Sequence, residues 1–367
     1  MPEASGGEPQ PRLLNGAQAI LEATEEALRR HPEVFVLGEG AQDPKGIFGT
    51  TTGLAETFGS HRVMEMPLAE NAFTGMAIGA ALMGQRALVI HQRVEFSLLA
   101  MEQLLNNAAK MFYVTGGRHR VPLTMRVVVG RGWGQGPAHS QSLENLFAGV
   151  PGLKVVLPSG AADLKGLLLG SIEDDNPVAF IEHRWVHYST GQVAAGYAPL
   201  PLDGPRRLRP GRDVTVVASS YMTLEALQAA DALAEHGIEV ELFDLRVARP
   251  LVLDEVFESV ARTGRLLTID VGFLRFGLGA EIVAQTTAEV FDDLLAAPRR
   301  LGLPDHPTPS SRSLAEAFYI RSPRIGAEVC DLVGAAAEVR SLVEEGLRSG
   351  RDDLPLDIPH PSFKGPF

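Results

Sequence analysis

The chain has 367 residues, of which 45% are hydrophobic and 21% are charged, and its formal net charge is −12 at pH 7. This length allows two domains with separate cores. The acidic balance disfavours binding to nucleic acid or to an anionic membrane surface, and no basic run offsets it. The single cysteine, Cys330, excludes an internal disulfide and every zinc or iron–sulfur spacing within the chain.

The N-terminal segment shows no sign of export. Residues 1–12 are polar, lack the apolar core of a signal peptide, and are expected to be a disordered lead. No apolar run approaches the length of a membrane span. We therefore expect a cytoplasmic protein.

Helix-like and strand-like segments alternate over residues 13–188. The apolar spacing predicts helices over residues 13–32, 69–85, 96–114 and 159–175. Short apolar runs predict strands over residues 34–40, 86–92, 122–130, 153–158 and 177–184. Such alternation is typical of a mostly parallel sheet that is covered by helices.

A second segment of the same kind follows an irregular stretch. Residues 189–212 are rich in Pro and Gly, and they are predicted to be an interdomain linker. Alternation resumes over residues 213–347, and residues 348–367 are expected to form an extended tail. The predicted fold class is therefore α/β, with two doubly wound domains over residues 13–188 and 213–347.

The carboxyl ends of the predicted strands are the candidate site, because open α/β sheets bind ligands there. Glu70 opens an almost uncharged helix. It is either a first-turn acid, favoured by the helix dipole, or a buried catalytic carboxylate beside apolar neighbours. The segment HQRVEF, residues 91–96, places polar residues at the end of the strand predicted over residues 86–92. Polar residues at this place either bind a ligand or form a simple exposed strand end. Phe96 in this segment is either a core residue or a stacking platform.

The loop GRGWGQGPAHS carries four glycines at alternate positions, from Gly130 to Gly136. It fits neither the dinucleotide fingerprint nor a P-loop, so its glycines are expected to let the backbone approach a ligand or a partner. His139 ends the loop and is either a proton donor or an ordinary loop residue.

Several of these segments together resemble a known family. They are PLAENAFTGMAIGAALMG, QLLNNAAKMFYVTGG, the run from Ala138 to Pro177, and later VELFDLRVARPL and FGLGAEI. In this order they are similar to the beta subunits of the decarboxylating component of pyruvate-type and branched-chain 2-oxo acid dehydrogenases. The resemblance covers about residues 13–340. It implies a thiamin pyrimidine-binding domain followed by a transketolase-type C-terminal domain.

The resemblance also assigns expected roles to single residues. Glu70 matches the glutamate that contacts N1′ of the thiamin aminopyrimidine, and Phe96 matches the aromatic residue that packs on this ring. Leu68 and Gln92 match residues that line the same pocket, although the family commonly has an apolar residue where Gln92 stands. His139 matches the active-site histidine, which orients the substrate or moves protons.

A structural potassium ion is a further expectation from the resemblance. Leu123, Ser171, Asp174 and Asn176 match a loop that holds this ion largely through backbone carbonyls. Because carbonyls are the ligands, the identity of these side chains says little about whether the ion binds.

The sequence lacks the Gly-Asp-Gly motif that holds Mg²⁺ and the diphosphate in thiamin enzymes. The resemblance therefore implies an alpha subunit that carries this motif, an α2β2 assembly, and thiamin diphosphate shared between the two chains. A lipoyl acyltransferase is a further expected partner. The charged residues Arg93 and Glu95 leave open an alternative, in which the complex transfers a two-carbon unit to a sugar or another carbonyl compound without a lipoyl partner.

Overall fold

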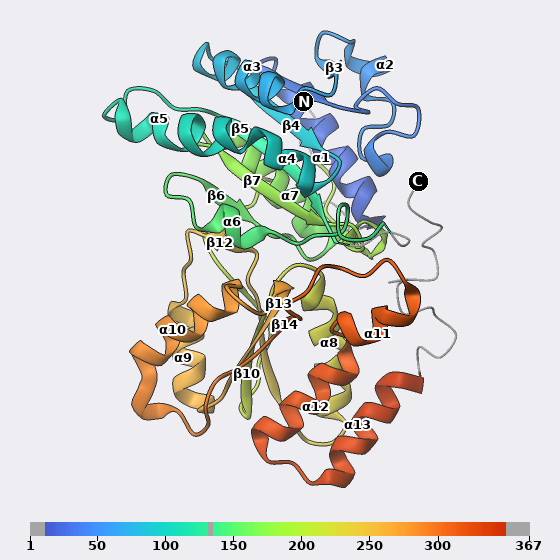
Figure 1. Ribbon diagram of the computed structural model, residues 1–367, viewed down its shortest axis with the longest axis vertical. Helices are drawn as coiled ribbons and strands as arrows, with labels where there is room; N and C mark the ends of the chain where they lie inside the picture. The colour runs from blue at the N-terminus through green and yellow to red at the C-terminus, as the bar shows by residue number, and fades with distance from the viewer. Residues whose placement is uncertain (1–11, 131–134, 350–367) are drawn as a thin grey trace, which may run out of the picture.

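The computed structural model describes residues 12–130 and 135–349, in which two α/β units follow one another along the chain (Figure 1). The first unit contains a seven-stranded sheet with the order β12-β6-β7-β5-β4-β2-β3. All neighbours are parallel except β12 and β6. The strands are β2 (Val34–Gly38), β3 (Val63–Glu65), β4 (Arg86–His91), β5 (Leu123–Val129), β6 (Lys154–Val156), β7 (Val178–His183) and β12 (Val247–Arg249).

Helices cover both faces of this sheet, as strand β2 illustrates. Val34 and Val36 pack in one core with the helices α1 and α7, whereas Phe35 and Leu37 pack in another core with α3. A strand buried on both faces is apolar throughout, which is why the parallel sheet was predictable from short apolar runs. The helices of this unit are α1 (Gly16–Arg30), α2 (Leu54–Phe58), α3 (Glu70–Leu82), α4 (Val94–Ser97), α5 (Ala109–Val114), α6 (Glu144–Ala148) and α7 (Ala161–Glu173).

Two predicted helices differ from the structure in detail. Helix α1 begins at Gly16 because Asn15 caps it in a capping box with Gln18, and a short strand, β1 (Arg12–Asn15), precedes it. The helix predicted over residues 96–114 contains a π-helical stretch, Gln103–Ala108, immediately before α5. Such a stretch widens one turn of the helix, and apolar periodicity does not reveal it.

The second unit contains a five-stranded sheet with the order β14-β13-β10-β11-β9, in which only β9 is antiparallel to its neighbour. Its helices also lie on both faces, α8, α12 and α13 on one and α9 and α10 on the other (Figure 1). The strands are β9 (Arg206–Arg209), β10 (Val214–Ala218), β11 (Val240–Asp244), β13 (Leu266–Phe273) and β14 (Arg299–Leu303). The helices are α8 (Tyr221–Ala234), α9 (Asp254–Thr263), α10 (Leu278–Val290), α11 (Ala315–Phe318), α12 (Ser322–Val333) and α13 (Ala337–Ser349). The mostly parallel sheets and their helices confirm the predicted α/β class.

The two units are joined more closely than an irregular linker implies. Within residues 189–212, β8 (Thr190–Val193) pairs with β1, and β9 joins the second sheet. Conversely, β12 lies beyond the predicted linker in sequence but extends the first sheet. The domain limits predicted from the sequence remain a prediction. The strands β8, β9 and β12 each pair with a segment on the other side of one of these limits.

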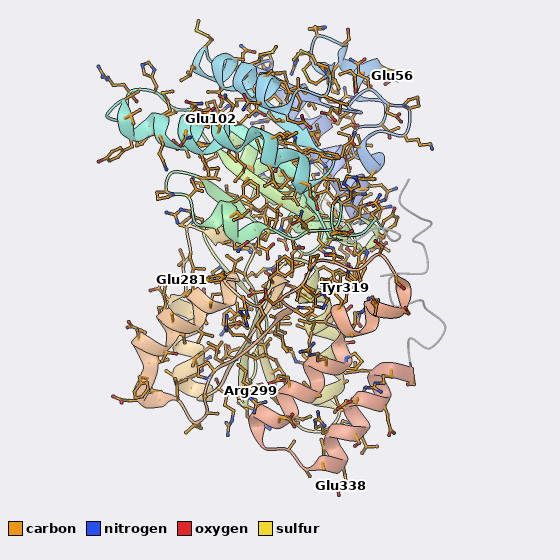
Figure 2. The ribbon with its side chains drawn as sticks, viewed as in Figure 1. Glu56, Glu102, Glu281, Arg299, Tyr319 and Glu338 are labelled. Atoms are coloured by element: carbon orange, nitrogen blue, oxygen red, sulfur yellow. The ribbon has the colours of Figure 1, made fainter. Side chains whose placement is uncertain are left out.

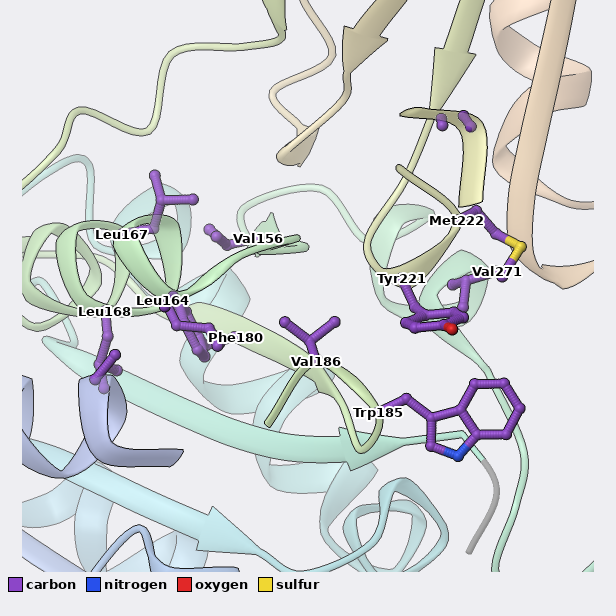
Figure 3. Close-up of a cluster of buried hydrophobic side chains, with 14 of the residues drawn as sticks. Val156, Leu164, Leu167, Leu168, Phe180, Trp185, Val186, Tyr221, Met222 and Val271 are labelled. Atoms are coloured by element: carbon purple, nitrogen blue, oxygen red, sulfur yellow. The ribbon is translucent and has the colours of Figure 1, made fainter. Parts of the chain in front are cut away.

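Aromatic side chains fill the junction between the units. Trp185 packs against Tyr221, with ring centroids 5.0 Å apart (Figure 3), and against Tyr319, with centroids 5.4 Å apart. Tyr319 lies between the two units (Figure 2). Because Trp185 lies just after β7, the second unit fixes the position of the segment that follows this strand.

Candidate active site

A cavity of about 710 Å³ opens at the carboxyl ends of four neighbouring parallel strands. Each strand contributes residues from the segment that follows it, as expected for a ligand site in an α/β sheet. These residues are Gly40 after β2; Gln92, Arg93 and Phe96 after β4; Gln135 and His139 after β5; and Arg184 and Tyr188 after β7. Asp43, Lys45, Gly46, Phe48 and Gly49, from the loop between β2 and α2, complete the lining.

Four of the residues singled out from the sequence meet in this cavity. They are Gln92, Arg93, Phe96 and His139. The rings of Phe96 and His139 lie edge to face, with centroids 5.5 Å apart. Nδ1 of His139 is buried and accepts or donates no hydrogen bond among the described residues, so this nitrogen is available to a ligand.

Glu70 lies beside the cavity at the first turn of α3, and only 6% of it is exposed. Its neighbour is Glu39, which follows β2. Burial, the charges of Glu70 and Glu65, and a side-chain hydrogen bond to Glu70 raise the pKa of Glu39. Glu39 therefore holds a proton more readily than an isolated glutamate does, at the edge of the cavity and next to Glu70.

Gln92 and Glu65 hold the segment that carries Glu39 in place. The Gln92 side chain donates to the backbone carbonyl of Glu39 over 2.6 Å. The Glu65 carboxylate accepts hydrogen bonds from the backbone of Gly40 and Gln42, at 2.6 and 2.9 Å. Gln92 therefore has a positioning role that its polarity alone did not indicate.

Leu68 does not line the cavity of this chain. It precedes α3 and is 85% exposed, so it faces away from the packed core. It is one of several large apolar side chains exposed on the same part of the first unit. A further chain that covers this part would bury them.

The two segments that depart from the resemblance contact each other. The Arg93 guanidinium donates to the side chain of Gln135, and the Glu95 carboxylate accepts from the backbone N–H of Gln141 over 2.8 Å. Both contacts hold the glycine-rich loop close to β4. His139 stands between the two attachment points in the chain.

Glycines of this loop allow close packing within the chain. Gly130 has φ +87°, and a Cβ there would lie 2.3 Å from the ring of His183. Gly136 has φ +66° and would meet the side chain of Ser310, from the second unit, at the same distance. Trp133 and the other residues 131–134 lie outside the described residues.

The four residues expected around potassium lie at the start of β5 and the end of α7. The carbonyl of Ser171 accepts from the Thr124 hydroxyl over 2.9 Å, and that of Asp174 accepts from Arg86 over 3.1 Å. A carbonyl oxygen has two lone pairs, so the Asp174 oxygen keeps one for a cation, whereas the Ser171 oxygen also accepts from the backbone N–H of Asp174 over 3.3 Å. The Asp174 side chain accepts from the backbone of Asn176, whereas Leu123 is buried in β5. Within the described residues, His, Cys, Asp and Glu side chains nowhere gather in threes around a space that suits a metal ion.

Comparison with known proteins agrees with the fold. Residues 14–186 match the family model "Transketolase, pyrimidine binding domain", and residues 205–325 match "Transketolase, C-terminal domain". The chain is 38% identical to the acetoin:2,6-dichlorophenolindophenol oxidoreductase subunit beta of Cupriavidus necator, over 86% of this chain and 96% of that protein. It is 37% identical to the pyruvate dehydrogenase E1 component subunit beta of Rickettsia bellii, over 81% of this chain and 91% of that protein.

The chain belongs to the beta subunits of 2-oxo acid dehydrogenase E1 components. A further member, the acetoin:2,6-dichlorophenolindophenol oxidoreductase subunit beta of Bacillus subtilis, is 36% identical over 89% of this chain and 99% of that protein. A solved structure named "Split gene transketolase, inactive beta4 tetramer" has a TM-score of 0.68 at 22% identity, and covers 88% of this chain and 98% of its own. That likeness shows the transketolase-type fold. The E1 beta family predicted from the sequence is thus confirmed, and it is favoured over the biosynthetic transferase.

Sequence reasoning missed several residues in or beside this E1 beta chain's cavity. Glu39 ends an apolar strand within VFVLGEG, and Arg184 ends another within PVAFIEHR. Both have the signal that singled out HQRVEF, a charged residue just after a buried strand. Phe48 lies in an irregular loop and carried no such signal.

Proposed function

We propose that the chain is the beta subunit of a thiamin-diphosphate-dependent E1 component that decarboxylates a 2-oxo acid and passes the acyl unit to a lipoyl carrier. The observation that carries this proposal is the cavity at the carboxyl ends of the strands, in a chain similar to E1 beta subunits along most of its length. Phe96 and His139 lie in this cavity, and the Glu39–Glu70 pair lies beside it.

The residues present fit the aminopyrimidine half of the cofactor. Phe96 offers an aromatic face, Glu70 holds or donates a proton at N1′, and Gln92 orders the wall between them. Thiamin diphosphate, when bound, accepts the electron pair that is released as the carboxylate leaves. Glu39 lies next to Glu70, and its pKa is raised by burial and by the charge of Glu70, so it is suited to retain a proton beside the contact between Glu70 and N1′.

His139 is proposed to orient the substrate and to move a proton during acyl transfer. Its free Nδ1 atom and its place in the cavity beside Phe96 support this role. A histidine is suited to proton transfer, because each of its ring nitrogens can either donate or accept a proton.

An alpha subunit is proposed to supply the rest of the site. The sequence contains no Gly-Asp-Gly motif, so Mg²⁺ and the diphosphate are assigned to that partner in an α2β2 assembly. The apolar side chains around α3 and α5 are its proposed docking surface. They are Leu68, Met76, Leu82, Met83, Leu98, Leu99, Phe112, Tyr113 and Val114. Exposed apolar groups of this extent are typical of a permanent interface.

Three further proposals complete the assignment. The carbonyls near Ser171 and Asp174 hold a potassium ion, a lipoyl acyltransferase is the acyl acceptor, and the complex acts in the cytoplasm. In the described part of the chain, no helix combines the length and the apolar character needed to cross a lipid bilayer.

The replacement Glu70→Gln tests the catalytic assignment. It keeps the size of the side chain but removes its ability to exchange a proton, so turnover of a 2-oxo acid by the α2β2 complex should fall at least about 100-fold. Assembly and thiamin diphosphate content should remain as in the wild type. Turnover close to that of the wild type would reject the assignment.

A further inference from the structure

We propose that Arg93 and Arg184 form an anion-binding subsite, which selects 2-oxo acids whose side chain carries a second acidic group, a carboxylate or a phosphate. This inference rests on the proposed function, because it names the substrate class for the same cavity. The subsite lies in the wall formed by the segments after β4 and β7.

Both arginines are buried in the wall of the cavity, where a charged group is costly unless it is compensated. Arg93 is 5% exposed and Arg184 is 1% exposed. They approach one aromatic ring, since their Cζ atoms lie 4.9 and 4.1 Å from the centroid of Phe48. Cation–π contact offsets part of this cost. The negative charges of Glu95 near Arg93 and of Glu182 near Arg184, and a hydrogen bond from Arg184 to the Tyr188 hydroxyl, offset a further part. The two positive charges still lie side by side at this ring, and the charge of Arg184 lowers the pKa of Arg93.

The backbone of Phe48 is strained in this arrangement. Phe48 has φ +55° and ψ +32°, a left-handed conformation that bulky residues rarely adopt. Strained residues of this kind persist where the surrounding structure holds them, often at ligand sites. Here the strained residue places its ring beneath the arginine pair.

Arg93 retains a donor for a ligand. Its Nη2 atom donates to Gln135, but its buried Nη1 atom has no hydrogen-bond partner within residues 12–130 and 135–349. Burial and then the neighbouring charge of Arg184 lower the pKa of Arg93 to about 10. Arg93 is therefore still positively charged at neutral pH, and an anion would relieve the repulsion between the two arginines.

The charge of the whole cavity favours an anion as well. Lys45 lines it together with the two arginines, and Asp43 is the one acidic residue of the described lining. A positive cavity in a chain of net charge −12 concentrates anions at that place. The planar guanidinium matches both carboxylate and phosphate oxygens.

The anion is assigned to the substrate's side chain and not to the carboxylate that is lost. A strong ion pair with the departing carboxylate would stabilise the bound substrate more than the transition state, which slows decarboxylation. An anion at the far end of the substrate adds affinity without this penalty.

The test compares two acids of equal length with the purified α2β2 complex. 2-Oxoglutarate ends in a carboxylate, whereas 2-oxovalerate ends in a methyl group. The wild type should prefer 2-oxoglutarate in kcat/KM, and Arg93→Gln should lower this preference about 10- to 100-fold, mainly through KM. Arg93→Lys should restore part of it. Arg212→Gln, a matched loss of charge at an exposed position, should leave the preference unchanged.

Binding without turnover separates this inference from the proposed function. Glutarate and inorganic phosphate are titrated calorimetrically into the complex after removal of thiamin diphosphate. The subsite is supported if either anion binds to the wild-type complex and the Arg93→Gln replacement abolishes this binding. This support holds even if the complex decarboxylates neither 2-oxo acid and the proposed function fails. Turnover of 2-oxovalerate with no binding of either anion overturns the subsite alone. The subsite is also overturned if Arg93→Gln weakens the affinity for thiamin diphosphate but leaves the preference for 2-oxoglutarate over 2-oxovalerate unchanged. The arginines would then bind the cofactor and not the substrate.

Discussion

At the scale of single residues, charged groups after apolar strands shape the cavity in two different ways. Arg93 lines it with a buried donor that has no partner among the described residues, whereas Glu95 holds the glycine-rich loop through the backbone of Gln141. The sequence placed both residues at the end of a strand. It did not distinguish their roles, because the partner of Glu95 lies 46 positions further along the chain.

Glu95→Ala should loosen the loop that carries His139. The backbone N–H of Gln141 would lose a charged acceptor, an interaction of about 1.5–3 kcal/mol. We expect kcat to fall about tenfold or more, with faster hydrogen exchange over residues 135–141. Glu95→Gln keeps an acceptor and should restore most of both properties. Unchanged exchange in Glu95→Ala would show that the hydrogen bond does not hold the loop.

The candidate site could be predicted from the sequence in part. Motif order indicated Glu70, Phe96 and His139, and the structure brings the last two together in the cavity and places Glu70 beside it. Leu68 lies on an exposed surface and not in the cavity of this chain. Phe48 was not predictable, because a left-handed aromatic residue in an irregular loop leaves no periodic signal.

At the scale of elements, the apolar runs and helical spacing correctly indicated most strands and helices of both sheets. Pairings between distant segments were missed. β12 joins the first sheet although it follows β11 of the second, and β8 pairs with β1. Pairing over such a distance depends on tertiary packing, which local propensity does not encode.

Strand β11 carries a buried carboxyl group that should make stability depend on pH. Burial, and then the charge of Asp163, raises the pKa of Asp244 to about 7, although Ser159 donates a hydrogen bond to it. The folded state therefore binds this proton more tightly than the unfolded chain, whose Asp pKa is about 3.9. The contribution to stability is complete below about pH 4 and is lost as the pH rises to about 7.

Asp244→Asn should remove this part of the pH dependence. The variant should lose less stability than the wild type between pH 5 and 8, measured by denaturant unfolding. Asp293→Asn, at an exposed position, should leave the wild-type slope unchanged. An equal slope in Asp244→Asn and the wild type would show that Asp244 titrates normally.

At the scale of the whole molecule, the first unit has an exposed apolar surface around α3 and α5, and the sequence has no Gly-Asp-Gly motif to hold Mg²⁺ and a diphosphate. Both features fit a chain that is half of a larger enzyme. The double replacement Met83→Glu and Tyr113→Glu should weaken association with the alpha subunit by at least about 100-fold, because each buries a charge in the interface.

The control for this surface is Phe291→Glu, which changes an exposed aromatic residue of the second unit. Its complex should assemble normally in size-exclusion chromatography. The double variant should remain folded by circular dichroism, since its altered side chains are exposed. Normal assembly of the double variant would place the interface elsewhere.

The central claim, that this chain is the beta half of a thiamin-dependent E1 component, is tested most directly by purifying it under mild conditions from its own host. The preparation is analysed for partner chains by mass spectrometry and for thiamin diphosphate by its fluorescent oxidation product. The account predicts one further chain in equal amount, with a Gly-Asp-Gly motif, and one cofactor for each pair of chains. A chain that is recovered alone and without cofactor, under conditions in which complexes survive, would contradict it.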